Sequence, residues 1–320
     1  MKLSEEKLSA LRLRARINAA IRGFFAERGV LEVETPILSA AGNTEPNIDS
    51  FTTTFSGHVS AGPRLRWLRT SPEYPLKRLL AAGLGDCYEL GRVFRNGEAG
   101  GRHNPEFSML EWYRVGWDHH RLIEETVSLV RQLLALVDRQ ARVELLTYRE
   151  LFQRHVGVDP FTASLQQLQA PLAGIQIDGE GLSRDDWLDL LMTHRIQPAF
   201  SRQVLTVVHD WPASQAALAR IRPGDPPLAE RFELYLGPYE LANGYHELND
   251  AAEQRARFAR DHAVRSERGA VLPPLDQALL ASLDALPACA GVAVGVDRLL
   301  MCLLDTAAIA DVLALDFASA

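Results

Sequence analysis

The chain has 320 residues, a net charge of −7 and 47% hydrophobic residues, with a pI of about 5.8. This composition is typical of a globular protein and excludes a collagen-like, coiled-coil or wholly disordered chain. The negative charge argues against a broad basic surface for nucleic acid. Three cysteines without a C-x-x-C pair argue against a disulfide framework and a zinc knuckle.

The first ten residues, MKLSEEKLSA, contain no apolar stretch of the kind that a signal peptide carries. The longest apolar runs, such as 299–304, are too short to cross a bilayer. We therefore expect a cytoplasmic protein with no membrane partner.

The N-terminal part predicts a helix followed by a strand and a loop. Ser4 can cap the helix, apolar residues recur at helical spacing after it, and Gly29 can end it. The segment VLEVETP alternates apolar and polar residues, which predicts a half-buried strand ending at Pro36. Residues 42–64 are rich in glycine, asparagine, proline and serine and predict mostly loop.

The next part predicts three strands and two helices. LRWLRTSPE is typical of a strand that leads into a helix, with Pro72 in the first helical turn. CYELGRVFR and EFSMLEWYR predict two further strands, separated by a glycine-rich loop. Asp118 can cap a long helix that runs to about Val137.

The remainder predicts an insertion, a hairpin and a closing strand and helix. Residues of about 140–230 suggest several short helices, near 184–194 and 212–221. A hairpin with its turn at Gly237-Pro238 follows, then a helix over about 251–268, and GVAVGVDRLLMCLL predicts a strand feeding a helix. This order predicts an α+β fold with a mainly antiparallel sheet. We expect a single domain over 1–320, with the insertion at about 140–230.

The strand EFSMLEWYR places Phe107, Glu111 and Tyr113 on one face, with Met109 between them. A buried carboxylate is costly unless it is paired, so Glu111 is expected to meet a cation. On this strand alone, a salt bridge at the sheet rim fits equally well.

Arg95 ends the preceding strand, and Arg102 and His103 follow in the glycine-rich loop. Loop glycines let the backbone approach a ligand, and arginine suits phosphate oxygens. Gly291 and Gly295 precede Arg298, which would start a helix where a cation is unfavourable unless an anion is bound. Taken singly, these signals also fit a solvated loop and an exposed arginine.

Three glutamates, Glu233, Glu240 and Glu247, lie seven residues apart in the predicted hairpin. Seven is odd, so a straight strand would alternate their faces. The hairpin turn can bring Glu233 beside Glu240, and a bend at Asn243-Gly244 could redirect Glu247. Converging carboxylates favour Mg²⁺ with a phosphate-bearing ligand, although the spacing alone also fits a charged surface hairpin.

The segments VETP, FRN…RHNPEF and GVDR resemble motifs 1, 2 and 3 of the class II aminoacyl-tRNA synthetases. TSPEYPLKRL, HNPEFSMLEWY and ELANGYHELND are similar to the lysyl branch. Together with the length and with PASQAALA, they resemble the elongation factor P–lysine ligases, which are stand-alone paralogues without the anticodon-binding domain. The resemblance runs from about residue 10 to the C-terminus and implies the class II catalytic fold.

This resemblance implies an enzyme that uses ATP and Mg²⁺ to activate lysine, preferably (R)-β-lysine, as an adenylate. The acceptor would be a lysine side chain of elongation factor P, no tRNA would take part, and the chain would form a homodimer through motif 1. Two alternatives stay open: a lysyl-tRNA synthetase-like enzyme that charges tRNA without an anticodon domain, and a non-catalytic paralogue that senses lysine or an adenylate.

The resemblance also implies roles for particular residues. The catalytic residues would be Arg95 and Arg298. The ATP site would comprise Arg95, Asn96, Gly97, His103, Asn104, Phe107, Glu240, Leu241, Gly295 and Arg298. The lysine substrate would contact Ser71, Pro72, Glu73, Glu111, Tyr113 and Glu247. Glu233 and Glu240 would hold Mg²⁺.

Motif 2 departs from the family pattern at one position. The family reads Arg-x-Glu, whereas here Arg95-Asn96 is followed by Gly97, with Glu98 one place later. Either Glu98 substitutes through a shifted loop, or the backbone reads adenine. Gly97 is the one feature that favours the sensing paralogue.

Overall fold

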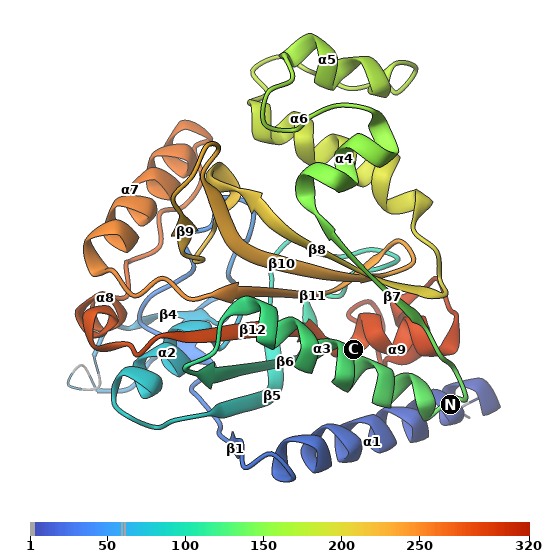
Figure 1. Ribbon diagram of the computed structural model, residues 1–320. Coiled ribbons are helices and arrows are strands. Elements are labelled where there is room, and N and C mark those ends of the chain that lie inside the picture. Colours follow the sequence, from blue (N-terminus) through green and yellow to red (C-terminus); the bar gives the residue numbers. More distant parts are fainter. Residues whose placement is uncertain (1–3, 59, 61) are drawn as a thin grey trace. The chain divides into compact units, whose positions relative to one another are not determined.

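The computed structural model describes residues 4–58, 60 and 62–320. The chain has the predicted α+β fold with a mainly antiparallel arrangement of strands (Figure 1). Its residues divide into two compact units, Met1–Trp117 with Leu248–Ala320, and Asp118–Glu247. We call these the first unit and the second unit. The expected single domain with an insertion at about 140–230 stays a prediction.

The first unit contains two sheets. The larger one has the order β1–β5–β6–β12, and only the β1–β5 pair is parallel. Its strands are β1 (Leu31–Glu32), β5 (Cys87–Phe94), β6 (Glu106–Val115) and β12 (Cys289–Gly295). The smaller sheet has the order β2–β4–β3, with β2 (Leu38–Ser39), β3 (Thr52–Thr54) and β4 (Leu65–Leu68).

The helices of the first unit are α1 (Glu5–Ala26), α2 (Glu73–Ala81), α7 (Ala251–Glu267), α8 (Gln277–Ser282) and α9 (Val296–Leu304). Ser4 caps α1 as predicted, because its side chain accepts a hydrogen bond from the Lys7 amide at 3.2 Å. Gly29 follows α1 with a φ of +66°, a conformation that suits glycine. No helix among the described residues is both long and apolar enough to span a bilayer.

The second unit has a four-strand core with the order β11–β10–β8–β7, and β9 adds to β10. Its strands are β7 (Arg142–Thr147), β8 (Val204–Pro212), β9 (Ile221–Arg222), β10 (Leu228–Leu236) and β11 (Tyr239–His246). Its α-helices are α3 (His119–Ala135), α4 (Tyr148–Val156), α5 (Leu165–Gln169) and α6 (Arg184–Leu191). The predicted hairpin is present, with Gly237 in its turn at a φ of +57°.

Three expectations about secondary structure were wrong. The expected helix near 212–221 is absent, because Trp211 and Pro212 pair with β10 and only a short 3₁₀ turn follows. The strands β7 and β8 lie in a region that the sequence suggested was mainly helical. The strand after α1 is only two residues long, and Leu31 is 51% exposed where the alternation placed it inside.

Asp297, the aspartate of the GVDR segment, connects three elements of the first unit through hydrogen bonds. It is 1% exposed in the first turn of α9. Its carboxylate accepts hydrogen bonds from the Arg14 guanidinium of α1 and, at 2.7 Å, from the Ser108 amide of β6. A buried carboxylate with a cation and a backbone donor is fully compensated, so the pair holds α1, β6 and α9 together.

We expect Asp297→Asn to lower the free energy of unfolding by about 3 kcal/mol, because it leaves a largely buried guanidinium without its counter-charge. Urea denaturation measures the change. The matched control is Glu27→Gln, which removes a 3.8 Å pair with Arg28 whose glutamate is 77% exposed. The control should shift stability by less than about 0.5 kcal/mol, and equal effects of the two variants would contradict the role of Asp297.

Candidate active site

One face of β6 in the first unit combines functional side chains with a floor of small residues. Phe107, Glu111 and Tyr113 share this face, as the sequence predicted. Residues paired directly across a strand point to the same face. The partners of this face on the two neighbouring strands include Gly91, Gly291, Ala293 and Gly295. Gly291, Ala293 and Gly295 have little or no side chain, so the backbone of β12 leaves room for a ligand on this face.

Glu111 is the centre of a hydrogen-bonded group in the first unit. It is 2% exposed and accepts hydrogen bonds from the hydroxyls of Ser71, at 2.6 Å, and Tyr113, at 2.7 Å. Burial, and then the negative charge of Glu73, raise the pKa of Glu111 to about 7. Two hydroxyl donors do not compensate a buried carboxylate as a cation does, so this site favours a positively charged ligand group.

Glu73 already has a cationic partner within the chain. The Lys77 ammonium lies 2.6 Å from the Glu73 carboxylate, one helical turn further along α2, and Lys77 is 1% exposed. Lys77 is not among the residues predicted from the sequence, although its i, i+4 spacing from Glu73 in EYPLK was the available signal. Pro72 is the N-cap residue of α2, one place before the first turn. A pocket of about 280 Å³ in the first unit is lined in part by Ser71 and Glu73.

The motif 2 residues come together around Arg95. Its guanidinium carbon lies 5.2 Å from the centre of the Phe107 ring, within cation–π range. Gly97 has a φ of +83°, so the chain turns in a way that suits glycine, and the next residue, Glu98, comes within 3.7 Å of Arg95. Asn96 is held by a backbone hydrogen bond to Asp49 at 2.7 Å.

The loop of motif 2 also meets motif 3. Arg298, near the start of α9, lies 2.7 Å from His103 Nε2. The two residues are far apart in the chain, and the sequence analysis assigned both to the ATP site. The structure therefore brings two of the predicted ATP-site residues into contact within the first unit.

The C-terminal segment supports the motif 2 loop, which the sequence analysis did not foresee. The Ile309 amide donates a hydrogen bond to the Gly101 carbonyl at 2.8 Å, and the Phe317 amide donates to Asn104 Oδ1 at 2.9 Å. The Asn104 side-chain amide in turn donates to the Glu106 carbonyl at 2.6 Å. We call residues 309–317 the C-terminal strap, because they hold both sides of this loop.

A buried ion pair that was not predicted from the sequence lies on the same face, because Glu89 pairs directly with Glu111 across β5 and β6. Arg69 and Glu89 lie 2.6 Å apart, and both side chains are almost completely buried. Thr35 of the VETP segment donates to Glu89 at 2.7 Å. A Cβ atom at Gly91 would come within 2.7 Å of the Arg69 guanidinium. Gly91 is therefore required by the ion pair, which occupies the space over it.

The three predicted glutamates Glu233, Glu240 and Glu247 belong to the second unit. Glu233 pairs with Asn243, whereas Glu240 pairs with Tyr235, so the register shifts between these pairs and Leu241 is the extra residue. This β-bulge places Glu240 on the face of Glu233 and Asn243. It lies closer to the hairpin turn than the bend that the sequence analysis placed at Asn243-Gly244.

Glu247 follows β11 directly and forms a bridge to Ala219. It is 2% exposed. Asn243 and Glu247 are four residues apart, so a continuing strand keeps them on one face. In a straight strand the odd spacing would place neighbouring glutamates on opposite faces. Because of the bulge at Leu241, the three glutamates lie on one face.

Glu233 is buried and held by two donors. The Arg231 guanidinium lies 2.6 Å from its carboxylate, and the Tyr235 hydroxyl donates to it. Burial, and then the charge of Glu240, raise the pKa of Glu233 to about 7 despite these donors. Arg231 does not fully offset the two carboxylates, so this face favours a further cation.

The first unit thus carries two groups of predicted residues, around Glu111 and around Arg95 and Arg298, and the second unit carries the acidic face of the hairpin. The family model of the class II tRNA synthetases (D, K and N) matches residues 1–317. The chain belongs to this family.

Curated relatives of similar length narrow the assignment within the family. The chain is 48% identical over 298 residues to the elongation factor P–(R)-β-lysine ligase of Vibrio cholerae serotype O1, covering 92% of this chain and 91% of that protein. It is 46% identical over 309 residues to the ligase of the same name from Mannheimia succiniciproducens, covering 96% and 94%. The Salmonella paratyphi B ligase is 47% identical over 305 residues. The predicted resemblance to the elongation factor P–lysine ligases is confirmed.

We expect the stability of Glu111→Gln relative to the wild-type chain to increase as the pH rises from about 4.5 to about 7. In this range the native state retains a proton on Glu111 that the unfolded chain releases. Stability is therefore lost in the wild-type chain as the pH rises through the raised pKa, on the order of 2 kcal/mol, whereas glutamine does not titrate. Urea denaturation at both ends of the range measures the difference.

The control for this experiment is Glu27→Gln, since Glu27 is exposed. Its stability difference from the wild-type chain should not change with pH. A pH-independent difference for Glu111→Gln as well would show that the buried carboxyl does not hold its proton to about pH 7.

Proposed function

We propose that the chain activates lysine or (R)-β-lysine with ATP and transfers it to a lysine side chain of elongation factor P. The observation that carries this proposal is the match to ligases of that name along nearly the whole chain. The chain is a ligase of the class II type, and the buried carboxyl group of Glu111 would bind an amine of its substrate.

In the first step, the substrate carboxylate attacks the α-phosphorus of ATP. A bond forms between the carboxylate oxygen and phosphorus, and pyrophosphate leaves with the electrons of the broken bond. The carboxylate is already ionised at neutral pH, so the step needs no general base. Catalysis then rests on positioning and on the positive charge of Arg95 and Arg298. Phe107 would stack against adenine, with support from Asn96, Gly97, His103, Asn104, Leu241 and Gly295.

The substrate's amino groups would bind the buried carboxylates. Glu111, oriented by Ser71 and Tyr113, would accept the ε-ammonium group. The resemblance to the family implies lysine binding for Glu247 as well. Glu73 would meet the second amine at the start of α2, beside Pro72. Because Glu73 already pairs with Lys77, its carboxylate would interact both with the Lys77 ammonium group and with the amine of the substrate.

Glu233 and Glu240 would hold Mg²⁺ in the second unit. Burial, and then repulsion from the charge of Glu240, raise the pKa of Glu233, and a cation beside the two carboxylates would offset both effects. Carboxylate oxygens are the ligands that Mg²⁺ prefers, and the ion would offset charge on the phosphates of ATP.

Glu98 would take the place of the missing motif 2 glutamate. Its approach to Arg95 to within 3.7 Å supports the shifted-loop alternative. The presence of Arg95, Arg298 and the three glutamates of the hairpin also favours an enzyme over a sensing paralogue, because a sensor has little need of charge for phosphate chemistry.

In the second step, the neutral side-chain amine of the acceptor lysine attacks the activated carbonyl carbon. An amide bond forms, the bond to the phosphate oxygen breaks, AMP leaves and the amine loses a proton. A free lysine has a pKa of about 10.4, so binding must favour its neutral form.

The choice of acceptor tests the proposal directly. We expect elongation factor P incubated with the chain, ATP and (R)-β-lysine to gain the mass of one β-lysyl group on one lysine. Intact-mass and peptide mass spectrometry detect the product, and α-lysine in a parallel reaction measures the isomer preference. Omission of ATP is the control. Charging of tRNA in place of elongation factor P would support the synthetase-like alternative.

Two variants should separate the nucleotide and lysine sites. Arg298→Ala should reduce lysine-dependent ATP–pyrophosphate exchange by at least about 100-fold, because it removes charge that stabilises the transition state. Glu247→Gln should instead raise the KM for lysine by about tenfold or more, with little change in ATP binding measured by calorimetry. Retained exchange in Arg298→Ala, or equal loss of ATP and lysine binding in Glu247→Gln, would contradict these assignments.

A homodimer formed through motif 1 is part of this proposal. The region around motif 1 exposes several large apolar side chains in the isolated chain: Leu31, Ile37, Leu38, Phe55 and Leu65. Apolar side chains in one region of the surface are typical of a protein–protein interface.

A further inference from the structure

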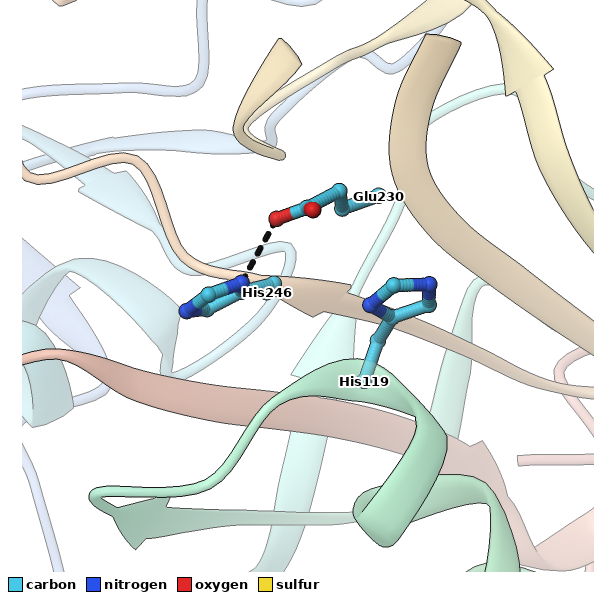
Figure 2. Close-up of side chains that lie close together, drawn as sticks. All are labelled: His119, Glu230 and His246. Carbon is cyan, nitrogen blue, oxygen red and sulfur yellow. Dashed lines mark hydrogen bonds and ion pairs between the residues drawn. The ribbon is translucent and has the colours of Figure 1, made fainter. Parts of the chain in front are cut away.

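The second unit contains a cluster of two histidines and a glutamate that the proposed mechanism does not use. His119 is the first residue of α3, Glu230 lies on β10, and His246 ends β11. One ligand atom from each of the three side chains lies within 4.8 Å of the other two. Figure 2 shows the three side chains facing one another, and their residues come from three separate elements.

His119 lacks the partners that a buried imidazole needs. It is 1% exposed, and neither of its ring nitrogens has a hydrogen-bond partner among the described residues. One of these nitrogens points toward His246 and Glu230 (Figure 2). A buried polar atom without a hydrogen-bond partner is destabilising, so this site favours a group that accepts the nitrogen's lone pair.

Burial, and then the neighbouring His120, lower the pKa of His119 to about 3. A neutral imidazole is the form that ligates metal ions, and a metal cation can accept the lone pair of a ring nitrogen that has no hydrogen-bond partner.

Glu230 and His246 are already oriented toward each other. His246 Nδ1 lies 2.6 Å from Glu230 Oε2, and both side chains are less than one-fifth exposed. Arg222 lies 3.9 Å from Glu230, and Arg220 lies 3.4 Å from His246 Nε2. Each of the two side chains therefore also has an arginine as a neighbour.

The geometry points to a Zn²⁺ site formed by His119, Glu230 and His246, with water in the fourth position. Two imidazoles and one carboxylate are typical zinc ligands, whereas Mg²⁺ prefers oxygen alone. Ligand atoms at about 2.0–2.1 Å from a tetrahedral ion lie roughly 3.3 Å apart. The partly exposed Glu230 and His246 side chains can reach this spacing by small rotations.

Zinc binding redistributes one proton in this cluster. The lone pair of His246 Nδ1 forms the bond to the ion, and the imidazole proton moves from Nδ1 to Nε2. The long contact between Nε2 and Arg220 then opens, and the Glu230 carboxylate exchanges its hydrogen bond to His246 for a bond to the ion. The occupied site would tie the start of α3 to β10 and β11.

The test is zinc binding by the full chain. The chain is stripped of metal with a chelator and dialysed against Zn²⁺ in the presence of excess Mg²⁺, and bound zinc is counted by elemental analysis. We expect about one Zn²⁺ per chain and a higher melting temperature in its presence. His119→Ala and Glu230→Gln should weaken zinc binding at least about tenfold and abolish the shift in melting temperature.

Two control variants make this result specific. His194→Ala removes an exposed histidine of the same unit outside the cluster, and Glu233→Gln removes a carboxylate of the proposed Mg²⁺ site. Both should bind zinc as the wild-type chain does. If His119→Ala does not fold, Glu230→Gln decides, since glutamine keeps the shape of the side chain.

Three results would overturn the inference. The wild-type chain could take up no stoichiometric zinc, His119→Ala and Glu230→Gln could bind it with unchanged affinity, or the loss could appear in Glu233→Gln instead. None of these results bears on the transfer of lysine, so the zinc site and the proposed function stand or fall separately.

Discussion

Buried carboxylate groups are the constraint on which both units depend. A buried carboxylate is stable only with a cation or several donors, so each one fixes the elements that supply its partners. Asp297 joins α1, β6 and α9 through Arg14 and the Ser108 amide, and Glu89 is matched by Arg69. Glu111 and Glu233 are different, because their raised pKa values show incomplete compensation within the chain. The carboxylates whose charge is balanced within the chain, Asp297 and Glu89, stabilise the fold. Glu111 and Glu233, whose charge is not fully balanced, are available to bind ligands.

The sequence predicts those parts of the fold in which local pattern and tertiary packing agree. The cap at Ser4, the hairpin turn at Gly237 and the shared face of Phe107 and Glu111 all follow from short-range rules of spacing and conformation. The helix expected near 212–221 failed because intrinsic helix propensity is a small energy per residue even for alanine, and pairing of Trp211 and Pro212 with β10 outweighed it.

The site was predicted less completely than the fold, because several of its contacts join distant parts of the chain. Lys77 could have been found from its helical spacing to Glu73, but nothing local links Arg69 to Glu89 or the C-terminal strap to Asn104. The convergence of the hairpin glutamates depends on one extra residue, Leu241, whose bulge no simple periodicity indicates. Resemblance to a family supplied those assignments that spacing left ambiguous.

The C-terminal strap has a practical consequence for work with this chain. Its amides at Ile309 and Phe317 hold the loop that carries His103 and Asn104, so the loop's conformation depends on residues far from it in the sequence. A deletion that removes the strap would loosen the loop without altering any residue within it. Loss of activity in such a variant would therefore reflect a displaced loop and not the loss of a residue from the loop itself.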